Sequence, residues 1–133
     1  MSETDIQVVR DQFQAVNETD WGLAMDLYAE DVVLVVHPSF GFETGTFEGK
    51  QAVGDWFGHW FRAFEPGFRF EIDEAREVGD VVLLHAQMSG VGRSSGVPVQ
   101  NDLAYLYEVR GGKITRAQIF KAREEALAAA EAE

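Results

Sequence analysis

The chain has 133 residues, of which 46% are hydrophobic, and this suits one compact domain spanning residues 1–133. Its 11 basic and 23 acidic residues give a net charge of −12, which disfavours nucleic acid or a membrane surface as a partner. Because the chain has no cysteine, disulfides and thiolate zinc sites are excluded, and a cytoplasmic location is expected.

Hydrophobic spacing predicts three helices and one strand in the first half of the chain. The expected helices span residues 3–16, a segment after residue 20 that carries Trp21, Ala24, Leu27 and Tyr28, and residues 50–64. The strand runs from Val32 to His37, and the segment after it, SFGFETGTFEG, is typical of a loop.

From Phe68 onward the hydrophobic period changes from helical to alternating, as in half-buried strands. Further strands are expected at residues 81–89, 97–109 and 113–120, followed by a terminal helix rich in Ala and Glu. Helices segregated from an antiparallel meander indicate an α+β fold. A curved antiparallel sheet closed by three N-terminal helices would form a cone that encloses a pocket.

Several local phrases follow one another along nearly the whole chain: DLYAEDVVLVV before a proline, GTFEGKQAV, GRSSGVPV, EVRGGKITRAQIF and REEALAAA. Their order resembles the nuclear transport factor 2-like superfamily, in its SnoaL-like polyketide cyclase and ketosteroid isomerase branch. The phrases are specific to the fold and not to an activity, because this superfamily contains isomerases, cyclases, dehydratases, epoxide hydrolases and binding proteins. The resemblance implies a homodimer through the outer sheet face, where His85 is expected.

His37 ends the first predicted strand and precedes Pro38. In the resembling ketosteroid isomerases a carboxylate before a proline on this strand is the general base, so the resemblance implies that His37 is the catalytic base. A histidine, with an ordinary pKa of about 6.5, can move a proton near neutrality. The alternative is a strand-end histidine that hydrogen-bonds a backbone carbonyl.

Asn101 and Tyr105 belong to the inward set of the strand at residues 97–109, because period two places its odd positions inward. The resemblance implies that Tyr105 donates a hydrogen bond to an enolate oxygen, with Asn101 as a ligand-binding residue. Gln12 stands where the isomerases carry a donor tyrosine, and it is a ligand-binding candidate together with Tyr28. The alternative for Tyr105 is an ordinary core tyrosine.

Helix 50–64 carries an apolar stripe that contains Trp56 and Trp60. Packing against the sheet explains most of the stripe, but two such large rings also suit the wall of a pocket for a flat ligand. Trp56 and Trp60 are therefore predicted to bind ligand. The sequence GRSSG matches a nucleophile motif, but it joins two antiparallel strands and is interpreted as a hairpin turn.

Two functions remain open. The first is a cofactor-independent acid–base isomerase or cyclase that acts on a hydrophobic carbonyl compound, such as a polyketide or steroid-like ring system. The second is a non-catalytic module that binds a hydrophobic ligand or dimerises, favoured by the departures at His37 and Gln12. No metal site is predicted, because the histidines lack ligand spacing. An epoxide-hydrolase reaction ranks last, because no inward carboxylate pair is predicted.

Overall fold

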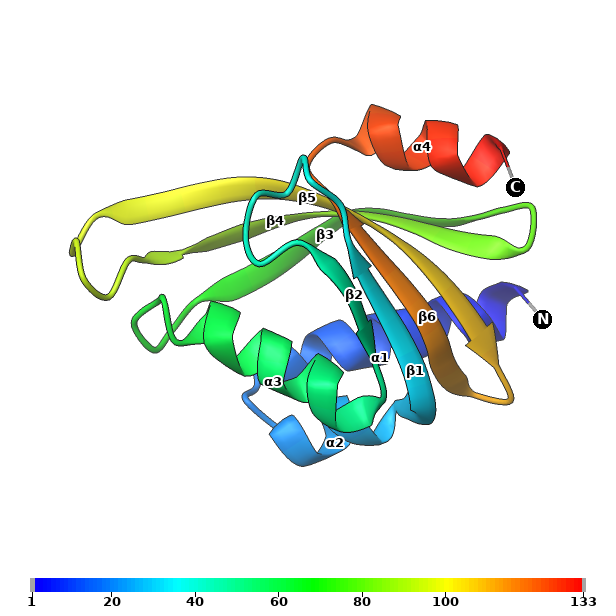
Figure 1. Ribbon diagram of the computed structural model, residues 1–133, viewed down its shortest axis with the longest axis horizontal. Helices are drawn as coiled ribbons and strands as arrows, with labels where there is room; N and C mark the ends of the chain where they lie inside the picture. The colour runs from blue at the N-terminus through cyan, green and yellow to red at the C-terminus, as the bar shows by residue number, and fades with distance from the viewer. Residues whose placement is uncertain (1, 133) are drawn as a thin grey trace.

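A six-stranded sheet separates three helices on one face from a fourth on the other in the computed structural model, which describes residues 2–132 (Figure 1). The helices are α1 (Ser2–Asn17), α2 (Trp21–Asp26), α3 (Lys50–Phe61) and α4 (Arg123–Glu131). The strands are β1 (Tyr28–Val36), β2 (Gly45–Glu48), β3 (Arg69–Val78), β4 (Val81–Val91), β5 (Pro98–Arg110) and β6 (Lys113–Phe120). The predicted α+β architecture is confirmed.

The strand order is β2-β1-β6-β5-β4-β3, and every neighbouring pair is antiparallel except β1 and β6. The sheet is therefore mixed, because the long connection through α3 and the meander brings β6 alongside β1 in the same direction. The strand β2 lies in a segment that the sequence indicated to be a loop. It has four residues and is bounded by Gly45 and Gly49 at positive φ, so it is too short to show an alternating pattern.

Several element boundaries differ from those predicted, among them the start of β1 and the end of α3. Tyr28 begins β1 and does not belong to α2, which is capped at its start by Asp20 and has only six residues. The helix α3 ends at Phe61, and the chain to Phe64 continues in tight turns with the Ala63 and Phe64 N–H groups bonded three residues back. Pro66 follows closely, and a proline disfavours helical geometry at the residue before it.

The core has two parts, one on each face of the sheet. The larger lies between the sheet and α1, α2 and α3, and the inward residues of β5 (Leu103, Tyr105 and Tyr107) belong to it, as period two predicts. The smaller lies under α4, where Ala126 and Ala130 pack over Leu83, Leu106 and Phe120. Both faces of β4 and β5 are thus partly buried, which explains the apolar runs VVLL in β4 and LAYLY in β5.

Candidate functional site

An open groove of about 840 Å³ runs between α2 and α3. It is called the helix groove below. Its apolar walls come from α2, α3 and the linker into β3, and they include Trp21, Met25, Phe57, Phe61, Phe64 and Phe68. Trp21 at its mouth is 43% exposed, which is high for so large an apolar side chain. An apolar concavity of this kind is the usual form of a small-molecule site.

Aromatic rings in the helix groove lie nearly parallel to one another. The ring of Phe61 stacks on Trp21 with centroids 5.4 Å apart, and on Phe68 with centroids 4.9 Å apart. The ring of Phe57 stacks on Phe61 at 5.8 Å. Such a set of parallel faces presents flat apolar surface, which favours a flat ring system as the ligand.

A small inner cavity of about 10 Å³ lies behind Phe57 and Phe61, which line it as well as the helix groove. Three of the sequence-predicted residues meet here. Gln12 and Tyr105 line the cavity, and the Gln12 Nε2 donates a hydrogen bond to the Tyr28 hydroxyl at 3.2 Å. The cavity holds at most one water, which needs about 10–15 Å³, so a larger molecule enters only if the two phenylalanine rings move.

Burial changes the acidity of the tyrosines around the inner cavity. It raises the pKa of Tyr28, Tyr105 and Tyr107 well above the ordinary value, and for Tyr105 the nearby Tyr28 raises it further. The rings of Tyr105 and Tyr107 stack at 5.4 Å, because residues two apart on a strand share a face. All three hydroxyls therefore stay protonated at neutral pH, and they can donate hydrogen bonds but cannot act as bases.

Asn101 and Trp60 meet at a different place, a cavity of about 220 Å³ on the other side of α3. Phe40, Phe42 and Lys121 also line it, and the Lys121 Nζ lies 3.5 Å from the Asn101 Oδ1. The structure thus places Asn101 and Trp60 in a different cavity from Gln12 and Tyr105.

His37 lies on the α4 side of the sheet. Its ring stacks on Phe120 with centroids 4.1 Å apart, and its Nε2 lies 2.9 Å from the Gln118 Oε1. Phe120 belongs to the core under α4, whereas Val36, the residue before His37, belongs to the core on the cavity side. The structure therefore does not bring His37 together with Tyr105.

Trp56 is buried and packs among Phe40, Phe42 and Phe47, with its Nε1 donating a hydrogen bond to the Glu43 carbonyl at 3.0 Å. It lines none of the three cavities formed by residues 2–132 that are described above. Its contacts fix the loop before β2 onto α3.

Sequence reasoning missed the residues of the helix groove that lie outside the stripe of α3, above all Trp21, Phe68, Arg62 and Arg93. One available signal is the pair Gly54 and Gly58, which are four residues apart and share a helix face. Close packing explains Gly54, where an added Cβ would lie 3.2 Å from the Met25 Cε. At Gly58 it would meet only the Arg62 guanidinium, at 3.7 Å, so this glycine leaves the groove wall open.

The architecture and the cavities under α3 define a class of protein, the nuclear transport factor 2-like or ketosteroid isomerase-like α+β fold. A protein from Catenulispora acidiphila, crystallised with trimethylamine, is 24% identical, with 85% of this chain and 83% of that chain covered and a TM-score of 0.72. TerC, co-crystallised with polyporic acid, is 19% identical, with 96% and 98% covered and a TM-score of 0.75. An NTF2-like protein from Anabaena variabilis is 21% identical, with 90% and 87% covered and a TM-score of 0.75.

The family follows from the sequence itself. A family model described as a SnoaL-like domain matches residues 9–117, and the chain belongs to this family. No curated protein matches the chain significantly. The resemblance stated from local phrases is thereby confirmed.

Within residues 2–132, no helix is long and apolar enough to cross a membrane. Over the same residues, His, Asp and Glu side chains do not gather in groups of three or more that could hold a metal ion.

Proposed function

We propose that this protein binds a small, flat, mostly apolar molecule in the helix groove. The observation that carries the proposal is the groove itself, whose volume of about 840 Å³ lies within the range of about 300–1,000 Å³ of small-molecule sites. Its stacked rings would bury the faces of a flat ligand and remove apolar area from water. Two solved structures with this fold hold small organic molecules, trimethylamine and polyporic acid, which supports a similar use here.

The substitution Gly58→Leu tests the proposal, because it fills the groove without disturbing its frame. A helix is more stable with leucine than with glycine at an interior position by roughly 0.5–1 kcal/mol, and position 58 has space for a Cβ. We expect the affinity for neutral 2-naphthol, measured by titration calorimetry, to fall at least about tenfold, equivalent to ~1.4 kcal/mol. The free energy of unfolding in urea should not decrease.

His59→Leu is the matched control, because His59 is exposed on the same helix and faces Glu43 outside the groove. It should change the affinity for 2-naphthol by less than about twofold. The proposal is wrong if the wild-type protein does not bind the probe, or if Gly58→Leu binds it as well as the wild type does.

Acid–base isomerisation or cyclisation of a hydrophobic carbonyl compound is the second candidate. The protonated hydroxyls of Tyr105 and Tyr28 favour it, because they could hold a developing oxyanion in a water-poor site. It requires that Phe57 and Phe61 move aside. It also requires a base, and the residues lining the inner cavity include neither a carboxylate nor an imidazole within the described chain.

The resemblance implies that His37 is the base, and His37→Ala tests that role. Because the sheet lies between the imidazole and the inner cavity, we expect any turnover of a hydrophobic ketone to stay within about twofold of the wild-type rate. Loss of a general base typically costs about 10²–10⁴-fold. A loss of that size with unchanged ligand affinity would establish His37 as the base and contradict our expectation.

A further inference from the structure

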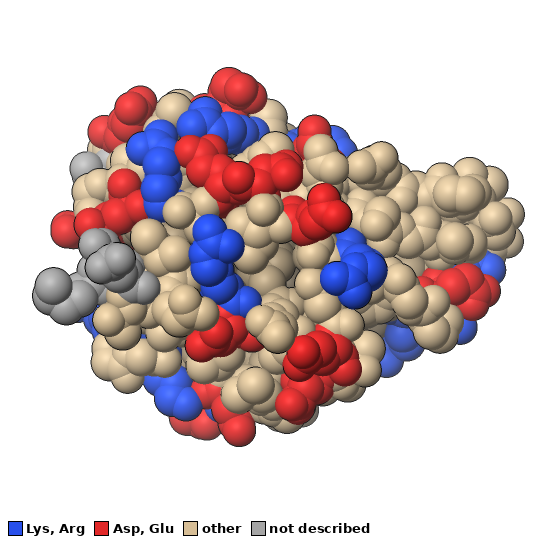
Figure 2. Space-filling model, turned by 180° about the vertical axis from the view of Figure 1, so that it is seen from behind, with Lys and Arg blue, Asp and Glu red and all other residues tan. Residues whose placement is uncertain are grey.

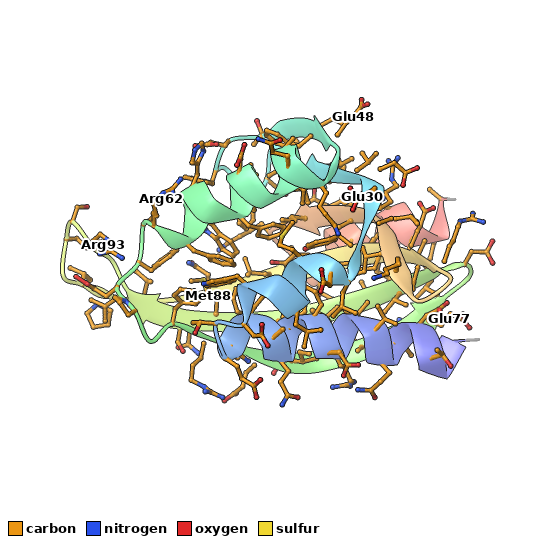
Figure 3. All side chains as sticks on the ribbon, turned by 90° about the horizontal axis from the view of Figure 1, so that it is seen from below. Glu30, Glu48, Arg62, Glu77, Met88 and Arg93 are labelled. Carbon is orange, nitrogen blue, oxygen red and sulfur yellow. The ribbon has the colours of Figure 1, made fainter. Side chains whose placement is uncertain are left out.

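Two arginines close the end of the helix groove that lies nearest the β4–β5 hairpin. Arg62 follows the last residue of α3, and Arg93 lies in the hairpin loop. Both line the groove, and Figure 3 shows them at the same end, with Glu30 toward the other. The groove therefore has a mainly apolar wall that includes the acidic residues Glu30 and Asp55, and two cations at one end.

The backbone around α3 fixes the position of Arg93. Its N–H donates to the Ala63 carbonyl at 2.8 Å, its Nε donates to the Arg62 carbonyl at 3.0 Å, and its Nη2 donates to the Phe64 carbonyl at 3.0 Å. These acceptors are neutral carbonyl oxygens, so none of them is a counter-ion for the guanidinium, and its remaining N–H groups are available to a ligand.

The Arg62 guanidinium lies over the groove wall, because its Nη2 is 3.7 Å from the position that a Cβ on Gly58 would take. Neither Arg62 nor Arg93 has a carboxylate within 4.0 Å among the described residues. The other cation of the groove, Lys50, is paired with Glu30 at 3.3 Å. In a chain of net charge −12, two arginines without a carboxylate partner at one end of an apolar groove are an unusual local concentration of positive charge.

We propose that the ligand of the helix groove is an aromatic carboxylate, whose ring system lies against Trp21 and Phe61 and whose carboxylate binds Arg62 and Arg93. This inference rests on the proposed binding function. A planar guanidinium matches a carboxylate through two parallel hydrogen bonds, and such charge-assisted bonds are stronger than neutral ones. Apolar walls beside the pair reduce the competition from water.

A matched pair of probes tests the inference: 2-naphthoate and the neutral 2-acetylnaphthalene, which share a ring system. We expect the wild-type protein to bind 2-naphthoate about tenfold tighter at low ionic strength. Arg62→Gln should reduce this preference to about twofold or less while the affinity for 2-acetylnaphthalene changes by less than about twofold. Arg110→Gln is the control, because it removes the same charge at the end of β5, away from the groove.

Each outcome has a distinct meaning. If neither probe binds, the proposed function is wrong and this inference falls with it. If both bind equally and Arg62→Gln changes neither affinity, binding stands and the carboxylate inference is overturned. If Lys50→Gln removes the preference and Arg62→Gln does not, the anion binds at the opposite end and the inference is also overturned.

Discussion

Tyr28, Tyr105 and Tyr107 are all the tyrosines of the chain, and each is buried beside the inner cavity or bonded to a residue that lines it. Burial raises the pKa of each hydroxyl above that of a tyrosine in the unfolded chain. The protonated hydroxyls therefore favour the folded state at pH values below about 10, the pKa of a tyrosine in the unfolded chain. This contribution to stability is lost as the pH rises above about 10, because the tyrosines then ionise in the unfolded chain but not in the folded protein.

We predict that the folded protein shows almost no tyrosinate absorbance at about pH 10.5, where free tyrosine is largely ionised. At higher pH the absorbance of all three residues should appear together with the loss of far-ultraviolet circular dichroism. N-acetyltyrosinamide in the same buffer is the control for an unshifted phenol. Gradual ionisation near pH 10 in a protein with native dichroism would contradict the buried cluster.

The side that a strand residue faces could be predicted from the sequence where the period-two rule was applied. It placed Tyr105 correctly on the cavity side of β5. The same rule applied to β1 would have placed His37 on the opposite face from Val32, Leu34 and Val36, which is where it lies. The prediction of a pocket histidine rested on the resemblance instead, and a resemblance of order and spacing does not fix the direction of one side chain.

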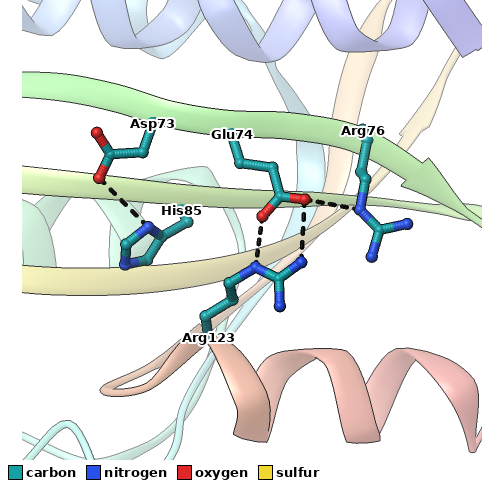
Figure 4. Close-up of polar contacts among 5 residues, drawn as sticks. All are labelled: Asp73, Glu74, Arg76, His85 and Arg123. Atoms are coloured by element: carbon teal, nitrogen blue, oxygen red, sulfur yellow. Dashed lines mark hydrogen bonds and ion pairs between the residues drawn. The ribbon is translucent and has the colours of Figure 1, made fainter.

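Among the elements, α4 is held on the sheet by one charged contact as well as by its alanines. The Arg123 Nε and Nη2 bond the two carboxylate oxygens of Glu74 at 2.5 and 3.1 Å, and Arg76 approaches the same carboxylate (Figure 4). The hydrogen bond from Arg123 is the largest cause that lowers the pKa of Glu74 from 4.5 to about 2. The ion pair therefore stabilises the fold above pH 4.5, and this contribution is lost as the pH falls from 4.5 through about 2.

At the element scale, we predict that Arg123→Gln makes the unfolding free energy less dependent on pH between about 4.5 and 2. Because the Glu74 side chain is 27% exposed, the loss at neutral pH should be only about 1 kcal/mol. Urea unfolding over a series of pH values measures both effects. Arg116→Gln, which removes a longer contact to Glu108 at 3.7 Å, is the control and should leave the pH dependence of the unfolding free energy below pH 4.5 unchanged. If Arg123→Gln also leaves this pH dependence unchanged, the stabilising role given to the Arg123–Glu74 pair is wrong.

Element types were predictable wherever a segment was long and periodic, as in α1, α3 and β5. The strand β2 was not, because its four residues are an edge that exists only through its pairing with β1. The groove between α2 and α3 was not predictable either. It depends on the angle at which a six-residue helix meets its neighbour, and no local spacing in the sequence encodes that angle.

For the molecule as a whole, the two sheet faces differ in what covers them. The cavities lie on the side of α1, α2 and α3, whereas α4 covers apolar residues of the outer face and leaves polar pairs such as Asp73 with His85 beside it. Acidic and basic side chains are interspersed on the face seen in Figure 2. The homodimer predicted from the resemblance would use the part of the outer sheet face that α4 leaves uncovered, and it stays a prediction.

We expect ligand to enter the helix groove and neither of the other two cavities described above. The three tryptophans report on it separately, because Trp21 lies in the groove, Trp60 lines the cavity beyond α3 and the Trp56 indole is bonded to Glu43. The first measurement is therefore a titration of the protein with 2-naphthol, followed by the indole N–H signals in ¹⁵N NMR and assigned by single Trp→Phe variants. We predict that the Trp21 signal shifts most and saturates, while the Trp56 signal stays in place. A Trp21 signal that does not move, or a larger shift at Trp60, would show that the ligand does not bind in the helix groove.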